Sequence, residues 1–360
     1  MSSVKTANQI LELRWQDSLE DYVTAIAWLP ALTGAKTSLV ASSAAGEVWL
    51  YPDKDPAQKI CLQESNGLSV DCLSISGDGQ FLAAAGQNGQ VKIWRFPSAY
   101  PELITTLENA PAWVDRMAWS PTQNLLAFSI GKYVQVWDAT TGEIAATLNF
   151  ESSSALDITW HPDGQRLTVS GYQGVKIWNS QDWDDDPYLL TIPSASLAIA
   201  WSPDGKYIAS GNLDLTITVL EWDNPHPWVM RGFSGKVRQL AWSKTRSPLL
   251  ACSSAESIVV WEKHSDVAIG WEGRVLEGHL AAIQSIQFQP DSLSLTSAAA
   301  DGRICWWQKS EKMAQVLEGA PQGFSCLAWH PQGSLLAAGG QNGELLIWTK
   351  AMKGQGFSKR

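Results

Sequence analysis

The sequence predicts an all-β fold made of one strand-rich unit that is repeated eight times along the chain. A pattern of short apolar strands and tight turns recurs every 41 to 47 residues. The chain holds 20 Trp residues, and most of them fall at two fixed places in this pattern. Pro, Asp, Asn and Gly separate the apolar stretches, as expected of turns between strands. A period of this length indicates one supersecondary unit used many times, and it decides the fold class.

Two positions define each unit. The first position ends the first strand and numbers the units one to eight: Trp28, Ile75, Trp119, Trp160, Trp201, Trp242, Phe288 and Trp329. The closing position recurs in the same order at Tyr51, Trp94, Trp137, Trp178, Leu220, Trp261, Trp307 and Trp348. Both series give the same count, so the high Trp content is mainly architectural.

Within a unit, each strand has its own composition. Val114–Trp119 is an apolar stretch with polar interruptions and predicts a first strand. The small-residue run Leu335–Gly340 suits a second strand packed between neighbouring sheets, and Gly343–Trp348 predicts a third strand that opens with a turn. Asn88-Gly89 and Asn342-Gly343 suit hairpins that need positive φ at both central residues. A fourth strand is expected in six units, at Leu103–Leu107, Ile144–Leu148, Leu189–Ile192, Trp228–Arg231, Arg274–Leu276 and Gln315–Leu317.

Two segments carry a resemblance to a known family. Leu327–Trp348 reads LAWHPQGSLLAAGGQNGELLIW, and Leu276–Trp307 reads LEGHLAAIQSIQFQPDSLSLTSAAADGRICWW. These residues resemble the WD40 repeat family, and the resemblance extends from about Tyr22 to Trp348. It implies a closed β-propeller in which each four-stranded sheet is one blade. Eight copies imply eight blades, and a seven-bladed ring, the commoner number in the family, is the alternative.

The resemblance also implies a buried hydrogen-bond network that only one unit keeps nearly whole. Members of the family join a His before the first strand, a Ser, an Asp in the last turn and the closing Trp. Unit seven has all four, as His279, Ser297, Asp301 and Trp307. Most other units lack the turn Asp, so we expect them to rely on apolar packing between blades and on turn geometry.

The N-terminal segment is expected to close the ring. Gln9–Trp15 alternates apolar and polar residues, as a half-buried strand does. We predict that it pairs beside Leu345–Trp348, because closure removes open sheet edges. The propeller would then form a single domain over residues 1–350. Residues 351–360 are polar and rich in Gly and Lys, and are expected to be a flexible tail.

Composition limits the expected cellular location of the protein and the classes of partner that it is expected to bind. The formal net charge is −10 and no Lys/Arg-rich run occurs, so no nucleic-acid partner is expected. The sequence contains no run of eighteen apolar residues, so no membrane span is expected. The five Cys residues are odd in number and scattered along the chain. We therefore expect a cytoplasmic, monomeric propeller with reduced cysteines.

No pattern in the sequence predicts catalysis or a cofactor. Nucleophile motifs, phosphate-binding loops and HExxH are absent. His161 and His330 occupy equivalent places in units four and eight, too far apart around a ring to share a metal. The acidic run Asp182–Asp186 lacks the Gly and Glu of a calcium loop. We predict no enzyme, no cofactor and no metal site.

The resemblance places a candidate partner-binding surface at one mouth of the channel, on the loops that enter the first strands. The candidate residues there are aromatic or charged, as in an interface core: Tyr22, Asp71, Trp113, Asp115, Arg116, Asp157, Lys236 and Arg238. The alternative is that these charges pair with one another and line a wet channel.

The opposite face offers a second candidate surface. It carries the long insertions Asn179–Pro187, Glu221–Pro227 and Glu262–Glu272. Trp183 and Trp271 lie in these insertions, outside the repeat positions, and exposed Trp residues would anchor a partner. The alternative is that each folds back onto its own blade.

The function that these observations favour is a non-catalytic scaffold or assembly factor that binds a protein or a peptide. The alternative function is a propeller enzyme or small-ligand binder that uses the central channel. That alternative needs converging His, Glu or Asp side chains in the channel, and the distribution of the five His residues argues against it.

Overall fold

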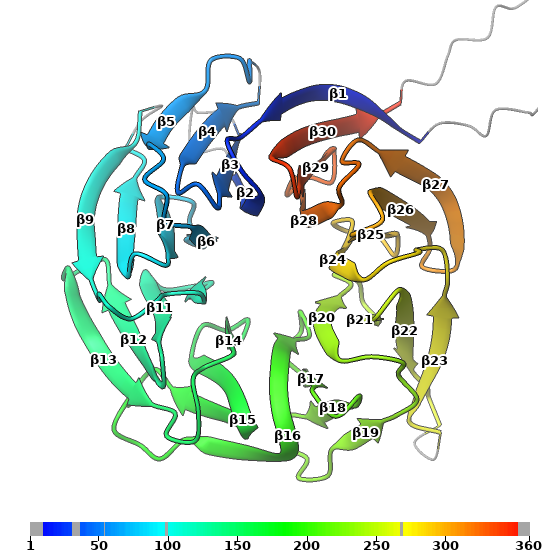
Figure 1. Cartoon of the computed structure of the whole chain (residues 1–360). Coiled ribbons are helices and arrows are strands. Elements are labelled where there is room, and N and C mark those ends of the chain that lie inside the picture. Colours follow the sequence, from blue (N-terminus) through cyan, green and yellow to red (C-terminus); the bar gives the residue numbers. More distant parts are fainter. Residues whose placement is uncertain (1–9, 31–36, 54, 98–99, 267–268, 352–360) are drawn as a thin grey trace, which may run out of the picture.

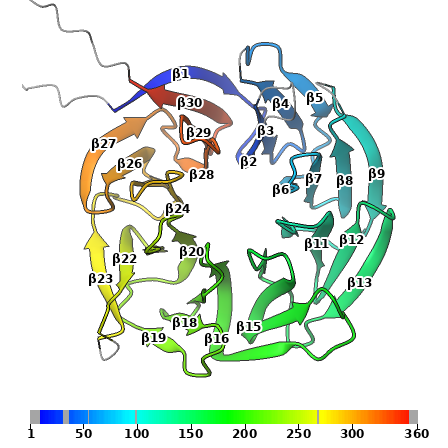
Figure 2. The same ribbon diagram turned by 180° about the vertical axis from the view of Figure 1, so that it is seen from behind.

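A computed structural model gives the fold of the chain and describes residues 10–30, 37–53, 55–97, 100–266 and 269–351. Thirty strands in these ranges surround a central channel, and the first and last of them lie side by side on the ring (Figure 1). The view from behind shows the same closed ring (Figure 2). The predicted tail falls almost entirely on residues 352–360, which lie outside the described residues. No helix among the described residues is long and apolar enough to cross a membrane.

Units one to three each form one antiparallel four-stranded sheet, as predicted. Unit one contains β2 (Val23–Leu29), β3 (Ser38–Ser43), β4 (Val48–Pro52) and β5 (Ile60–Gln63). Unit two contains β6 (Val70–Ile75), β7 (Phe81–Gly86), β8 (Gln90–Arg95) and β9 (Glu102–Glu108). Unit three contains β10 (Met117–Trp119), β11 (Leu125–Ile130), β12 (Tyr133–Asp138) and β13 (Glu143–Asn149).

Units six and seven have the same form, and unit eight borrows a strand. Unit six contains β20 (Val237–Trp242), β21 (Leu250–Ser254), β22 (Ser257–Lys263) and β23 (Trp271–Leu276). Unit seven contains β24 (Ile283–Phe288), β25 (Leu295–Ala299), β26 (Arg303–Gln308) and β27 (Lys312–Glu318). Unit eight contains β28 (Phe324–Trp329), β29 (Leu335–Gly340), β30 (Glu344–Lys350) and β1 (Leu11–Ser18).

Units four and five share one sheet, which corrects the predicted number of blades. Their strands are β14 (Asp157–Trp160), β15 (Arg166–Asn179), β16 (Tyr188–Trp201), β17 (Tyr207–Asn212), β18 (Ile217–Glu221) and β19 (Trp228–Met230). They form one six-stranded sheet beside six four-stranded sheets, so the described chain has seven sheets rather than eight, in agreement with the alternative count.

The physical reason is that β16 is continuous through two units. Its first half pairs with β15 as the last strand of unit four, and its second half pairs with β17 as the first strand of unit five. Strand β15 folds back on itself, so that the residues flanking its two ends lie together. The amide of Ser180, after the strand, donates to the carbonyl of Gln165, before it, at 2.8 Å. All eight sequence units are therefore present, although seven sheets carry them.

The inner strands form a closed cycle around the channel. They are β2, β6, β10, β14, the second half of β16, β20, β24 and β28, and each contacts its two neighbours in this order. The second strands lie deeper in the sheets. Strands β7, β17 and β29 are buried along their whole length, as the small-residue pattern predicts.

Trp side chains tie each inner strand to the unit before it. The six Trp residues at the first position donate their Nε1–H to the preceding unit at 2.9 to 3.2 Å: Trp28 to Ala328 O, Trp119 to Ser74 O, Trp160 to Ala118 O, Trp201 to Thr168 Oγ1, Trp242 to Ala200 O and Trp329 to Thr296 Oγ1. Ile75 and Phe288 have no such donor. One residue type thus supplies both apolar area and a directional bond between blades.

The hairpin expectation at Asn-Gly is wrong in one respect. Gly89 and Gly343 have positive φ, of 72° and 87°, whereas Asn88 and Asn342 do not. A Cβ at Gly89 would lie 2.6 Å from the carbonyl oxygen of Ala112, so Gly is required there for close approach as well as for φ.

The predicted ring closure is confirmed. Strand β1 pairs antiparallel with β30, with Leu11 opposite Lys350 and Leu13 opposite Trp348. Gln315 of unit seven holds the start of β1, because its side chain accepts from the amide of Leu11 at 2.8 Å and donates to the Leu11 carbonyl at 2.7 Å. Leu11 is fully buried among residues of units seven and eight.

Strand β1 also contacts unit one. Arg14 pairs with Asp53 at 2.9 Å and Asp17 with Lys59 at 2.8 Å. The rings of Trp15 and Tyr51 meet edge to face, with centroids 5.2 Å apart. The N-terminal strand thus joins units seven, eight and one.

We predict that Leu11→Asp lowers the free energy of unfolding by more than about 3 kcal/mol, because it places a carboxylate in the closed apolar seam. Leu13→Asp is the matched control, since Leu13 lies on the same strand with 48% of its side chain exposed. Urea unfolding followed by Trp fluorescence measures both. Equal stability of the two variants would contradict a seam that depends on β1.

Candidate partner-binding site at the channel mouth

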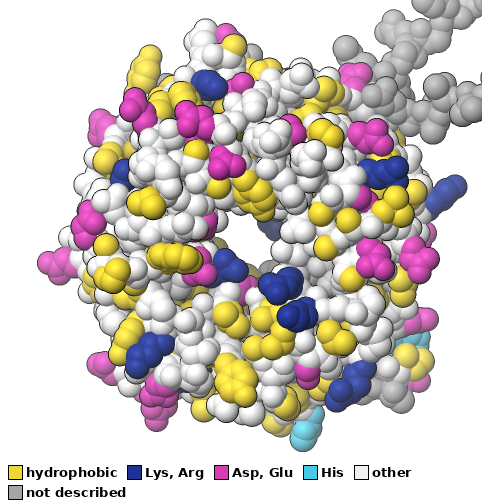
Figure 3. All heavy atoms as spheres, viewed as in Figure 1, with side chains coloured by type: hydrophobic (Ala, Val, Ile, Leu, Met, Phe, Trp, Pro, Cys, Tyr) yellow, Lys and Arg dark blue, Asp and Glu magenta, His cyan; other side chains and the backbone are white. Residues whose placement is uncertain are grey.

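The loops that enter the inner strands bring the predicted charged residues to one mouth of the channel. Asp71 lies on β6, Asp157 begins β14 and Arg238 lies on β20, while Asp115 and Arg116 directly precede β10. These strands are successive or opposite members of the inner cycle, and their starts therefore gather around one opening. Figure 3 shows acidic, basic and hydrophobic side chains around the opening of the channel.

Three carboxylates and one guanidinium form the acidic side of this mouth. Arg116 donates from Nε to the Leu156 carbonyl at 2.9 Å and from Nη1 to the Asp115 carbonyl at 2.8 Å, and its Nε lies 4.0 Å from Asp157. Hydroxyl groups contact the other two carboxylates, because Ser69 donates to Asp71 at 2.5 Å and Ser129 to Asp115 at 2.9 Å. Internal pairing thus occurs, as the alternative supposed, but among the described residues it involves one cation, Arg116.

Asp157 connects two units through its side chain. Its Oδ2 accepts from the amide of Ile199 on β16 at 2.9 Å, and its Oδ1 accepts from its neighbour Ile158 at 3.0 Å. Burial raises the pKa of Asp157 to about 6, although these amides and Arg116 favour the charged form. Burial and, to a lesser degree, the charge of Asp115 also raise the pKa of Asp71.

The other side of the mouth is basic and unpaired. Lys236 and Arg238 are exposed, and within the described part of the chain neither forms an ion pair. Their backbone is held firmly, because Val237 between them is fully buried. The guanidinium and ammonium groups are therefore available to a ligand.

Trp113 is the exposed aromatic residue of this site. It has 61% of its surface exposed, while the next residue, Val114, is fully buried. The carbonyl of Val114 accepts a weak bond from the thiol of Cys72 at 3.5 Å, and its amide donates to Gly86 at 3.1 Å. A rigid backbone thus presents a large apolar side chain to solvent. Tyr22, the other predicted aromatic residue, is half-buried at the start of β2.

The expectation of exposed Trp anchors on the opposite face is wrong for Trp271. It begins β23 and is only 9% exposed, and its ring packs edge to face against Tyr207 and Trp242. Trp183 is half-buried, with its ring 6.2 Å from that of Trp160 in an edge-to-face contact. Each Trp folds back onto the propeller, because apolar area of this size is stabilised by burial. We therefore do not retain them as binding residues.

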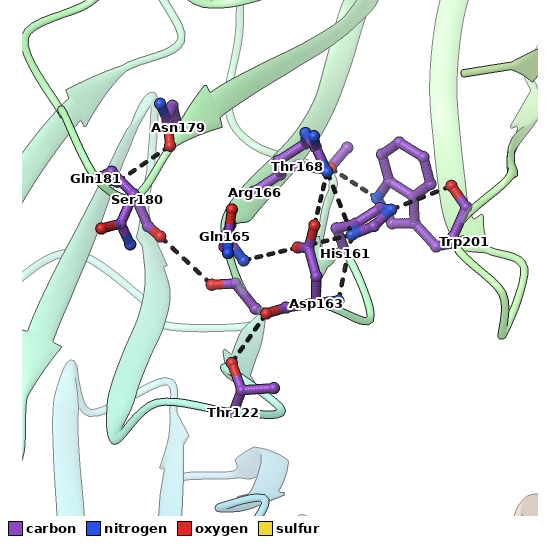
Figure 4. Close-up of polar contacts among 12 residues, drawn as sticks. Thr122, His161, Asp163, Gln165, Arg166, Thr168, Asn179, Ser180, Gln181 and Trp201 are labelled. Carbon is purple, nitrogen blue, oxygen red and sulfur yellow. Dashed lines mark hydrogen bonds and ion pairs between the residues drawn. The ribbon is translucent and has the colours of Figure 1, made fainter. Parts of the chain in front are cut away.

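On that opposite face the turns after the first strands join neighbouring units. His161 contacts the carbonyl of Gly205 at 3.1 Å through Nε2, and Asp163 bridges His161 Nδ1 at 2.7 Å and Arg166 Nη1 at 2.8 Å (Figure 4). Thr122 of unit three donates to the Asp163 carbonyl at 3.0 Å. Thr122 therefore joins unit three to unit four, and His161 joins unit four to unit five.

The equivalent residues of units seven and eight act in the same way. Gln289 donates to the Gly333 carbonyl at 2.9 Å, and His330 contacts Thr37 of unit one at 3.0 Å. Sequence reasoning missed this set of contacts. The available signal was a long polar side chain directly after the first-position aromatic residue.

The structure brings the four residues of the expected buried network together. His279 contacts Ser297 Oγ at 2.7 Å and Asp301 Oδ2 at 3.2 Å, and Trp307 donates its Nε1–H to Ser297 Oγ at 2.9 Å. Burial lowers the pKa of His279 in spite of the nearby carboxylate. Units one and five place other buried polar groups near this position, so these two units do not depend on apolar packing alone.

Two replacements show this clearly. In unit five the buried Asn212 donates to Thr216 at 2.9 Å and to Thr218 at 3.1 Å. In unit one the buried Glu47 accepts from the hydroxyl of Ser43 at 3.1 Å and from Trp49 Nε1 at 2.5 Å. Glu47 lies two residues after the position of the usual Asp, so its role depends on the folded turn. Unit five keeps an Asp at that position, and Asp214 accepts from the hydroxyl of Thr216 at 2.7 Å.

Within the described residues, potential metal ligands do not converge, and a pocket lies on the outer side of the ring. No group of three His, Cys, Asp or Glu residues in the described ranges is arranged to hold a metal ion. A pocket of about 520 Å³ lies at unit four, lined in part by Phe150, Tyr172, Leu189 and Pro193. It adjoins the outer half of β16 rather than an inner strand, and so lies away from the channel.

Comparison with known proteins gives a family match and several distant relatives. The chain matches the family described as WD domain, G-beta repeat over residues 59–95, 142–179, 189–221, 270–308 and 311–349, which together exceed half of its length. It is 24% identical over 289 residues to the transcriptional corepressor LEUNIG_HOMOLOG of Arabidopsis thaliana, covering 80% of this chain and 36% of that protein.

Two further relatives match over shorter segments. Pre-mRNA-processing factor 19 homolog 2 of Arabidopsis thaliana is 25% identical over 147 residues, which are 39% of this chain and 27% of the relative. Nuclear distribution protein nudF of Aspergillus niger is 27% identical over 150 residues, which are 40% of this chain and 33% of the relative. The chain thus spans about a third of the length of these curated relatives.

We predict that Asp157→Asn changes the pH dependence of stability. A pKa of about 6 in the folded state, above the ordinary value of 3.8, means that the folded state binds this proton more tightly than the unfolded state. The contribution of Asp157 to stability is therefore largest below about pH 4 and is lost as pH rises through about 6. The free energy of unfolding of the variant relative to the parent should rise by up to about 3 kcal/mol between pH 4 and pH 7.

Urea titrations at a series of pH values measure this effect. Asp185→Asn is the control, because Asp185 is an exposed carboxylate in the loop before β16. A constant difference between Asp157→Asn and the parent across that pH range would contradict the prediction.

We also predict that Ser297→Ala lowers the free energy of unfolding by about 1 to 3 kcal/mol, because it leaves the buried His279 Nε2 and Trp307 Nε1 without their shared partner. Thermal unfolding by circular dichroism measures the loss. Ser265→Ala, at an exposed loop position, is the matched control. An unchanged melting temperature for Ser297→Ala would show that the network contributes nothing to stability.

Proposed function

Because this chain belongs to the WD40 repeat family, we propose that it is a non-catalytic scaffold or assembly factor that binds a protein or peptide partner at the channel mouth. The observation that carries this proposal is the exposed Trp113 beside a ring of charged side chains, on a backbone held by the inner strands. Exposed aromatic and Arg side chains are the residues that contribute most to protein interfaces.

The relatives support a role of this kind. Their names describe a pre-mRNA-processing factor, a transcriptional corepressor and a nuclear distribution protein. None of these names refers to a catalysed reaction. The closed cycle of inner strands favours the proposal as well, since a preorganised surface reduces the entropic cost of binding.

The two faces of the propeller differ in what they offer to a partner. The turn face uses His161, Asp163 and Gln289 for contacts between units, and its Trp271 is buried. At the channel mouth, Lys236 and Arg238 are exposed, and Trp113 has most of its surface in solvent. We therefore place the partner at the channel mouth rather than on the turn face.

We predict that Trp113→Ala combined with Arg238→Glu abolishes partner capture while the melting temperature changes by less than about 2 °C, because both side chains are exposed. The measurement is affinity capture from native lysate with quantitative mass spectrometry, comparing the parent and the double variant. The control is Tyr188→Ala, which removes a ring exposed on the outer strand of unit four. Equal recovery of all proteins by the parent and the double variant would overturn the assignment of this surface.

A further inference from the structure

The charges at the channel mouth are divided between two opposite sides. The inner cycle runs β2, β6, β10, β14, β16, β20, β24 and β28, so that β20 is four steps from β6 in either direction. Asp71 on β6 and Arg238 on β20 therefore face each other across the opening. Asp115 and Asp157 belong to the two units that follow β6, so the acidic side extends from β6 over β10 to β14, which is two steps from β20.

Neither side is neutralised from within. On the acidic side three carboxylates share one guanidinium, and Arg116 directs two of its donors to the backbone carbonyls of Leu156 and Asp115. Within the described ranges neither Asp71 nor Asp115 forms an ion pair, and their side chains accept instead from the hydroxyl groups of Ser69 and Ser129. On the basic side, Lys236 and Arg238 form no ion pair within the described ranges.

Trp113 lies on the acidic side of this division. It precedes Asp115 by two residues and enters unit three from the loop that follows β9. An apolar anchor therefore lies next to the carboxylates and away from the lysine and arginine. A ligand that contacts the carboxylates, Trp113 and the two basic side chains has an apolar group next to its cationic end. Its anionic group lies at the other end.

We propose that the channel mouth binds an extended peptide segment of one polarity, with a Lys or Arg next to an apolar residue at one end and Asp or Glu at the other. Rims with opposite charges favour one orientation of a ligand and repel the reverse one. The segment crosses the opening from the units that carry Asp71, Asp115 and Asp157 to the unit that carries Lys236 and Arg238. This inference rests on the proposed function and specifies its ligand.

The test is selection of peptides of about 12 residues, which reach roughly 40 Å when extended, from a random displayed library on the full-length protein. The expected result is a set of peptides in which basic and apolar residues gather at one end and acidic residues at the other. The selected peptides should bind Lys236→Glu/Arg238→Glu at least ~10-fold more weakly, a loss of about 1.4 kcal/mol. Selection repeated on that variant should give peptides without the acidic end.

A second double variant separates this inference from the proposed function. Asp71→Asn/Asp115→Asn should lose the preference for the basic end and keep dependence on Trp113. Peptides that depend on Trp113 but show no charge polarity would overturn the inference and leave the proposed function standing. Peptides whose binding is unaffected by Trp113→Ala would overturn both. Thermal unfolding of every variant confirms that the ring is intact.

Discussion

The bond from each first-position Trp to the preceding unit is the constraint on which the ring depends. Six indole Nε1–H groups, from Trp28 in unit one to Trp329 in unit eight, donate across a boundary between units. The same rings are buried, so each boundary gains apolar area and a directed hydrogen bond from one side chain. A directed bond fixes the angle between neighbouring units, and a ring closes only if these angles are consistent. Strand β1 completes the cycle by joining units seven, eight and one.

This arrangement divides the molecule into a face that holds the ring and a face that is free to bind. On the turn face, His161, Gln289 and His330 reach from one unit to the next, so that their polar groups are already used. At the channel mouth the inner strands hold the backbone, and charged side chains project without complete partners. Exposed and incompletely neutralised groups add little to stability but much to recognition.

The differences between expectation and structure have a common origin. The period predicted the strands and the closing position, because these depend on local patterns of apolar residues. The pairing of β1 with β30 was predicted because closure removes open sheet edges. The period left open whether Trp183 and Trp271 are exposed or fold back, and only the structure shows that Trp271 is buried and that Trp183 packs on Trp160. It also missed Glu47 and Asn212, whose roles depend on how each turn is folded.

The sequence by itself determined the repeated unit, its eight copies and the residues that enter the inner strands, because strand periodicity and turn residues are local properties of the chain. Only the tertiary structure decided that units four and five share one sheet through the continuous strand β16. It also decided how the charges at the channel mouth are distributed around the opening. Asp71 and Arg238 are far apart in sequence, and closure of the cycle of inner strands places them on opposite sides of one opening. Closure is a property of all the units together, so no one repeat could indicate it.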